Sequence, residues 1–89
     1  MTINRYAARA DSNRSEIAAV FKAHGWEVYD LRRPTDLLCG KSGITLLVEV
    51  KTKRGRLTEA QSEFMRTWTG GPVVTIRTAE DAETAARMA

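Results

Sequence analysis

The chain has 89 residues, of which 43% are hydrophobic and 28% are charged, and its formal net charge is +3. This length suits one small domain and excludes two separate cores. The single cysteine, Cys39, excludes an intrachain disulfide and a cysteine-based zinc cluster. We see neither a signal peptide nor an apolar run of the ~20 residues that cross a bilayer, so we expect a soluble, cytoplasmic protein with no membrane partner.

The charges are unevenly distributed along the chain. Residues 1–56 contain eleven Lys or Arg and six Asp or Glu, whereas residues 57–89 contain three and five. A local basic excess suits a polyanion such as DNA or RNA, although a solvated surface gives the same pattern.

The N-terminal half predicts an arm, a helix and a strand. We expect residues 1–10 to form an N-terminal arm and residues 11–89 a single domain. In residues 12–24 apolar side chains recur at helical spacing, with Asp11 or Ser12 as the N-cap and Gly25 at the C-terminal cap. Residues 26–31 alternate as a strand does.

The rest of the chain predicts three more strands and two helices. Residues 36–39 and 44–51 are strands joined by a glycine-flanked turn at 40–43, and the second is apolar enough to be covered on both faces. A basic loop at 53–56 leads to a helix that begins at Thr58, which forms a capping box with Gln61. A strand at 73–76 and a final helix capped by Thr78 follow, so the predicted fold is α/β in the order α-β-β-β-α-β-α.

Three charged residues interrupt the predicted strand pair. Glu49 and Lys51 share one face, because side chains two apart in a strand point the same way. If the strands pair about the centre of the turn, between residues 41 and 42, Asp36 lies opposite about Leu47 and near Glu49. Two carboxylates and the main-chain carbonyl of Val50 are hard oxygen ligands of the kind that Mg²⁺ or Mn²⁺ prefers. Lys51 would orient a water or neutralise charge on a phosphate. The alternative to a metal site is a simple ion pair between Glu49 and Lys51 at the end of a strand.

These residues fit a known motif. The tripeptide PTD at 34–36 is followed after twelve residues by EVK at 49–51, which resembles the motif of the PD-(D/E)XK nuclease superfamily. With SEI at 15–17, LTEAQ at 57–61 and the order of the elements, residues 12–83 resemble small stand-alone, phage-type members of the VRR-NUC (virus-type replication-repair nuclease) family. One departure is Thr35, which stands between two residues that are usually adjacent in that family.

The resemblance implies a restriction-endonuclease-like αβββαβ(α) core, a mixed sheet flanked by helices. It implies a metal-dependent DNA endonuclease in which Asp36 and Glu49 bind Mg²⁺ or Mn²⁺ and Lys51 is catalytic. It also implies Glu16 as an accessory metal ligand and Gln61 at the edge of the catalytic site, although each also fits a helix capping box. Small members of this kind look like homodimers that act on branched DNA such as four-way junctions, here in a bacterial or phage-infected cytoplasm.

Basic residues on both sides of the motif are candidates for binding DNA phosphates, although solvated loops have the same composition. They are Arg32, Arg33, Lys53, Arg54 and Arg56. Two other functions stay open from the sequence: a non-catalytic nucleic-acid-binding module that retains the nuclease fold, and a structural protein without affinity for DNA.

Overall fold

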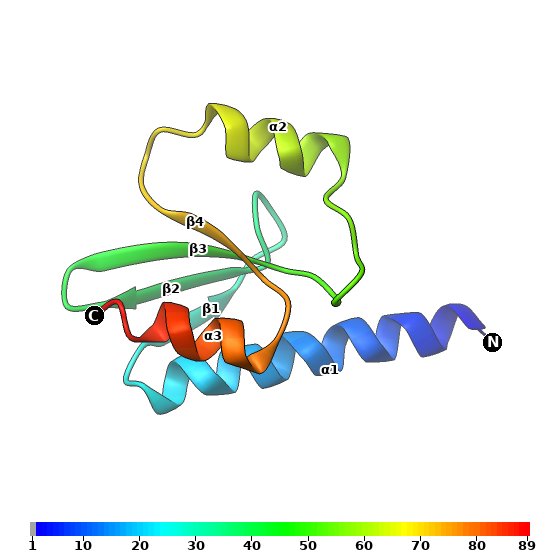
Figure 1. Cartoon of the computed structure of the whole chain (residues 1–89), viewed down its shortest axis with the longest axis horizontal. Coiled ribbons are helices and arrows are strands. Elements are labelled where there is room, and N and C mark those ends of the chain that lie inside the picture. The colour runs from blue at the N-terminus through cyan, green and yellow to red at the C-terminus, as the bar shows by residue number, and fades with distance from the viewer. Residues whose placement is uncertain (1) are drawn as a thin grey trace.

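The computed structural model describes the backbone of residues 2–89 and the side chains of residues 13–89. Over this range the chain is an α/β structure in which helices flank a mixed sheet of four strands (Figure 1). In chain order the elements are α1 (Thr2–Ala23), β1 (Glu27–Asp30), β2 (Leu37–Lys41), β3 (Ile44–Val50), α2 (Glu59–Thr67), β4 (Val73–Ile76) and α3 (Ala79–Ala86). The predicted order of elements is confirmed.

Helix α1 is longer than the sequence predicted. It begins at Thr2 and not near Ser12, and therefore includes most of the stretch expected to be an arm. That stretch contains neither Gly nor Pro and is rich in Ala and Arg, which favour helices, so the helix passes through the possible N-cap. Its C-terminal end agrees with the prediction, since Gly25 has a φ of 88°. Within the described residues no helix is long and apolar enough to span a membrane.

The strands lie side by side in the order β1-β2-β3-β4. The first three are antiparallel, whereas β3 and β4 are parallel, with α2 in the connection between them. Ser42 and Gly43 form the β2–β3 turn, and their φ angles of 53° and 81° are those of a two-residue hairpin turn. The turn is therefore centred one residue later than the sequence analysis placed it.

One face of the sheet is covered by α1 and α3 and carries the core (Figure 1). Leu37 pairs with Val48 and Cys39 with Leu46, and all four side chains are fully buried. They pack with apolar residues of the two helices, among them Ile17, Phe21, Ala82 and Ala86. Because core side chains are closely packed, this dry face fixes the positions of the residues that alternate with them on the other face.

Helix α2 lies over the opposite face and covers it loosely. None of its residues is buried, and Phe64 and Trp68 stack on each other with ring centroids 5.3 Å apart. The helix is linked to the sheet by polar contacts, including one between the Thr75 hydroxyl and the Met65 sulfur at 3.7 Å. On the edge strand Tyr29 is 59% exposed, so this face retains exposed apolar surface.

Candidate active site

The hairpin brings Asp36 beside Glu49. Leu37 pairs with Val48, and the Asp36 N–H donates to the same Val48 carbonyl at 3.0 Å, which holds Asp36 at the end of the strand pair. The sequence analysis placed Asp36 opposite about Leu47, whereas in the structure Leu47 pairs with Leu38, two residues later in the chain than Asp36. Moving the turn centre by one residue moves each cross-strand partner by two, and this correction brings the two carboxyl groups closer than expected.

Asp36 is fixed by main-chain contacts on both sides. Its Oδ2 accepts a hydrogen bond from the Val50 N–H at 2.8 Å, and its carbonyl accepts one from the Leu31 N–H at 2.8 Å. The preceding residue, Thr35, is 2% exposed and donates its hydroxyl to the Leu37 carbonyl at 3.3 Å. The additional threonine of the PTD tripeptide is thus packed inward, while Asp36 faces the end of β3.

Glu49 is a buried acid beside another acid. It is 3% exposed, and its Oε2 accepts a hydrogen bond from Gln61 Nε2 at 3.0 Å. Burial, together with the charge of Asp36 and a hydrogen bond to it, raises the pKa of Glu49 from 4.5 to about 7, against the opposing effect of Lys51. The two carboxyl groups therefore share a site in which a second negative charge is unfavourable without a cation.

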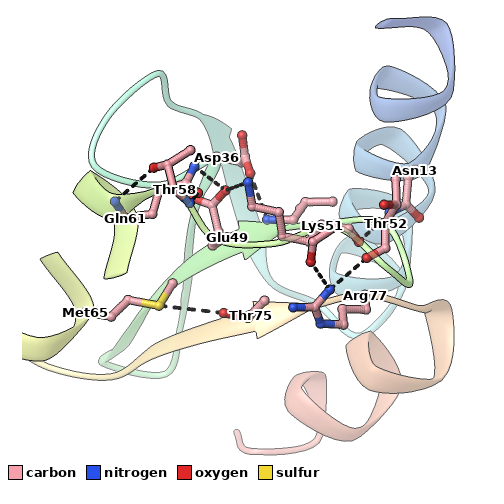
Figure 2. A network of polar contacts seen from close by, with 12 residues as sticks. Asn13, Asp36, Glu49, Lys51, Thr52, Thr58, Gln61, Met65, Thr75 and Arg77 are labelled. Atoms are coloured by element: carbon pink, nitrogen blue, oxygen red, sulfur yellow. Dashed lines mark hydrogen bonds and ion pairs between the residues drawn. The ribbon is translucent and has the colours of Figure 1, made fainter. Parts of the chain in front are cut away.

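Lys51 lies at the end of β3, next to the two acids (Figure 2). Its Nζ is 3.7 Å from Glu49 Oε2, and its side chain is 18% exposed. Its backbone is held from two other elements, because its N–H donates to the Ile76 carbonyl at 3.0 Å and its carbonyl accepts from Asn13 Nδ2 at 3.1 Å. The ammonium group is thus half-buried at a fixed position, within reach of water.

Gln61 connects α2 to these residues. The predicted capping box is confirmed: Thr58 Oγ1 accepts from the Gln61 N–H at 3.1 Å, and the Thr58 N–H donates to Gln61 Oε1 at 2.8 Å. The amide nitrogen of the same side chain reaches Glu49, as Figure 2 shows. Capping and contact with the acid, which the sequence analysis treated as alternatives, are therefore combined in one residue.

The donor set fits a divalent cation of the Mg²⁺ or Mn²⁺ type. Asp36 and Glu49 supply carboxylate oxygens. The N–H and carbonyl of a strand residue point to the same side, so the Val50 carbonyl is directed to the edge where its N–H meets Asp36. Mg²⁺ is commonly held by one or two carboxylates with several waters, and a cation here would relieve the repulsion between the acids.

Glu16 is not brought into this pair. Its side chain is exposed on α1, and residues 13–89 contain no group of three or more His, Cys, Asp or Glu side chains that could hold a metal. An accessory role for Glu16 stays a prediction. Asn13, three residues earlier on the same helix, donates to the carbonyl of Lys51, the residue that follows β3.

The predicted basic residues lie on two loops that flank the site. All five side chains, those of Arg32, Arg33, Lys53, Arg54 and Arg56, are exposed. The second loop is held by Arg77, whose Nη1 donates to the carbonyls of Thr52 at 2.9 Å and Gly55 at 2.5 Å (Figure 2). The sequence analysis missed Arg77, because an arginine that follows a strand carries no signal for a contact with a loop more than twenty residues earlier.

Comparison with known proteins identifies no relative of this chain. No family model matches the chain, and no curated protein or solved structure is significantly similar to it. Inferences about function therefore rest on the geometry of these side chains.

Proposed function

We propose that this chain is a metal-dependent DNA endonuclease with a PD-(D/E)XK core of the VRR-NUC kind. The observation that carries the proposal is the placement of Asp36 and Glu49 side by side, with the Lys51 ammonium 3.7 Å from Glu49. The order of the elements and the exposed arginines and lysines on both flanking loops are further support.

In this proposal the residues have separate roles in phosphodiester hydrolysis. Asp36, Glu49 and the Val50 carbonyl would hold Mg²⁺ or Mn²⁺, and the cation would polarise the phosphodiester and lower the pKa of a water. Lys51 would orient this water and offset negative charge that develops on the phosphoryl oxygens. Water is added across one P–O bond, which gives a phosphate monoester and a free hydroxyl.

Gln61 would act as a positioning residue in this reaction. Its amide N–H donates to Oε2 of Glu49, and hence directs the other lone pairs of that carboxylate towards the cation. The capping box fixes the Gln61 side chain from Thr58, so the start of α2 holds this donor at the acid. Loss of this contact would weaken binding of the cation more than binding of the DNA.

The proposed substrate is branched DNA, cut by a homodimer. Residues 13–89 of one chain carry one candidate site, whereas symmetric cleavage of a four-way junction requires two sites related by a two-fold axis. The surface available for a second copy includes Tyr29, 59% exposed, and Trp68, 44% exposed. Sedimentation equilibrium tests this step: a Tyr29→Glu variant should shift the protein towards monomer, whereas Arg87→Glu, on the exposed C-terminal end of α3, should not.

The test of activity uses four-way junction, flap and linear duplex DNA with Mg²⁺, Mn²⁺ or EDTA. We expect metal-dependent cleavage that falls by at least about a hundredfold in Asp36→Asn and Lys51→Ala. Matched variants at exposed positions, Asp30→Asn and Lys22→Ala, should cleave like the unaltered protein. Cleavage in EDTA, or undiminished cleavage by both site variants, would contradict the proposal; binding without cleavage in either metal would indicate the non-catalytic module.

A further inference from the structure

A cavity of about 520 Å³ opens next to the candidate site. Residues 32–34 (Arg-Arg-Pro) form one wall, and Thr58, Ala60, Gln61 and Phe64 of the second helix and its cap form the other. This volume is in the range of pockets that bind small organic ligands. The cavity differs from the pair of acids described above, but it shares Gln61 with that site.

Gln61 joins the cavity to the acids. The side chain that lines the cavity also donates its amide to Glu49 Oε2 at 3.0 Å. An occupant of the cavity therefore lies one side chain away from a residue proposed to hold the cation.

The two walls offer complementary chemistry. Arg32 and Arg33 are exposed and supply guanidinium groups, which bind phosphate oxygens through paired N–H donors. Phe64 is half-buried and stacks on Trp68, which restricts its ring, and it supplies an aromatic side chain to the lining of the cavity. Phosphate and an aromatic surface together are what one nucleotide requires, because unpaired bases are bound by stacking on such rings.

We propose that this cavity receives one unpaired nucleotide of the DNA strand, next to the phosphate that is cleaved. The inference rests on the proposed nuclease function and makes it more specific: the preferred substrate has an unpaired or extruded nucleotide beside the cleavage position. A base that is still paired and stacked in a duplex cannot enter a pocket between two protein walls without leaving the stack. Branch points and flaps supply such nucleotides at low cost.

The first experiment follows binding of a deoxynucleoside monophosphate, thymidine monophosphate, to the full chain in EDTA. Backbone amide resonances are recorded by ¹H–¹⁵N NMR during the titration. We expect saturable shifts at Arg32, Arg33 and Phe64. An Ala60→Trp variant, which fills the cavity from an exposed position of the helix, should lose these shifts. The matched variant Ser62→Trp, exposed on the same helix but outside the lining, should retain them.

The second experiment compares affinity for duplex DNA with and without a single unpaired nucleotide, again without metal. The unaltered protein should bind the unpaired form about tenfold more tightly, which is within the contribution of one base stacked on an aromatic side chain. Ala60→Trp should bind both forms equally, and Ser62→Trp should keep the preference. Circular dichroism of both variants verifies that the fold is retained.

The outcomes separate this inference from the proposed function. Absence of nucleotide shifts, shifts that survive Ala60→Trp, or equal affinity for both DNA forms would each overturn the cavity assignment, even if the protein cleaves DNA. Absence of cleavage with either metal, while the nucleotide shifts and the preference persist, would overturn the nuclease proposal and leave the cavity as a nucleotide-binding site.

Discussion

The environment of Glu49 predicts that stability falls as pH rises from weakly acidic to neutral. The unfolded chain loses this proton near pH 4.5, whereas the folded protein retains it until about pH 7. Between these values the folded state binds more protons than the unfolded state, so the free energy of unfolding decreases with pH. A carboxyl whose pKa rises from 4.5 to about 7 on folding contributes about 3 kcal/mol to this decrease. This contribution to stability is fully present below about pH 4.5 and lost above about pH 7.

The substitution that isolates this effect is Glu49→Gln. The new side chain is neutral at every pH, has nearly the same volume, and retains an oxygen that can accept the hydrogen bond from Gln61. Below about pH 4.5 the two proteins should be similarly stable. Above about pH 7 the variant should be more stable, by up to about 3 kcal/mol, because it buries no second negative charge next to Asp36.

The assay is urea unfolding followed by tryptophan fluorescence, at several pH values from about 4 to about 8. Each curve is compared with that of Glu27→Gln, in which an exposed carboxyl of the edge strand is neutralised. Millimolar Mg²⁺ should stabilise the unaltered protein more at the upper end of this range than at the lower end, because a bound cation favours the deprotonated acids. In Glu49→Gln the stabilisation by Mg²⁺ should be much smaller.

Parallel pH curves for Glu49→Gln and the unaltered protein would refute this reasoning. They would mean that Glu49 titrates at the same pH in the folded and unfolded states. An equal effect of Mg²⁺ on both proteins would separately refute the assignment of Glu49 as a cation ligand, whatever the pH dependence.

Three further predictions concern residues outside the acid pair. Arg77→Ala, which releases the loop after Lys51, should lower the free energy of unfolding by about 1–3 kcal/mol, measured by urea unfolding, and weaken DNA binding, measured by filter binding. Arg77→Lys should restore part of the lost stability and affinity, whereas Arg87→Ala should change neither quantity. Burial raises the pKa of the Cys39 thiol to about 11. A disulfide reagent at about pH 8 should therefore react with this thiol only after unfolding. Rapid reaction of the native protein would contradict the buried position. Trp26→Phe removes the indole donor to the Ala86 carbonyl at 2.8 Å and should cost about 1–3 kcal/mol, as a lowered urea midpoint; an unchanged midpoint would mean that this bond contributes nothing.

The order of elements was predictable because the signals for it are local. Gly25 and Thr58 mark helix ends through their backbone freedom and capping group, and the structure has both where expected. Cys39 lies in the short strand predicted at residues 36–39, and it is fully buried. The start of α1 was mispredicted because a good capping residue, Ser12, does not end a stretch that already favours helix.

The residues that form the candidate site could be predicted from the sequence, but the register and contacts that position them could not. Asp36 and Glu49 were expected to be neighbours, yet the register that brings them together depends on a left-handed φ at Ser42. A non-glycine residue rarely adopts this φ, and a sequence pattern does not reveal it. The contacts of Gln61 with Glu49 and of Arg77 with the basic loop depend on how distant segments pack. No periodicity in the sequence carries that information.

The two-residue turn at Ser42 and Gly43 also limits how this chain can vary in length. Both residues are exposed, and nothing lies within 4 Å of the position that a β-carbon on Gly43 would occupy. Exposed turns of this kind usually accept insertions. Here the turn sets the register of β2 on β3, and with it the position of Asp36 beside Glu49. A slip of one residue turns every side chain of a strand to the opposite face. A single residue inserted in this exposed turn, remote from the acids, would therefore turn the Asp36 side chain towards the core face of the sheet, unless a β-bulge accommodated the extra residue.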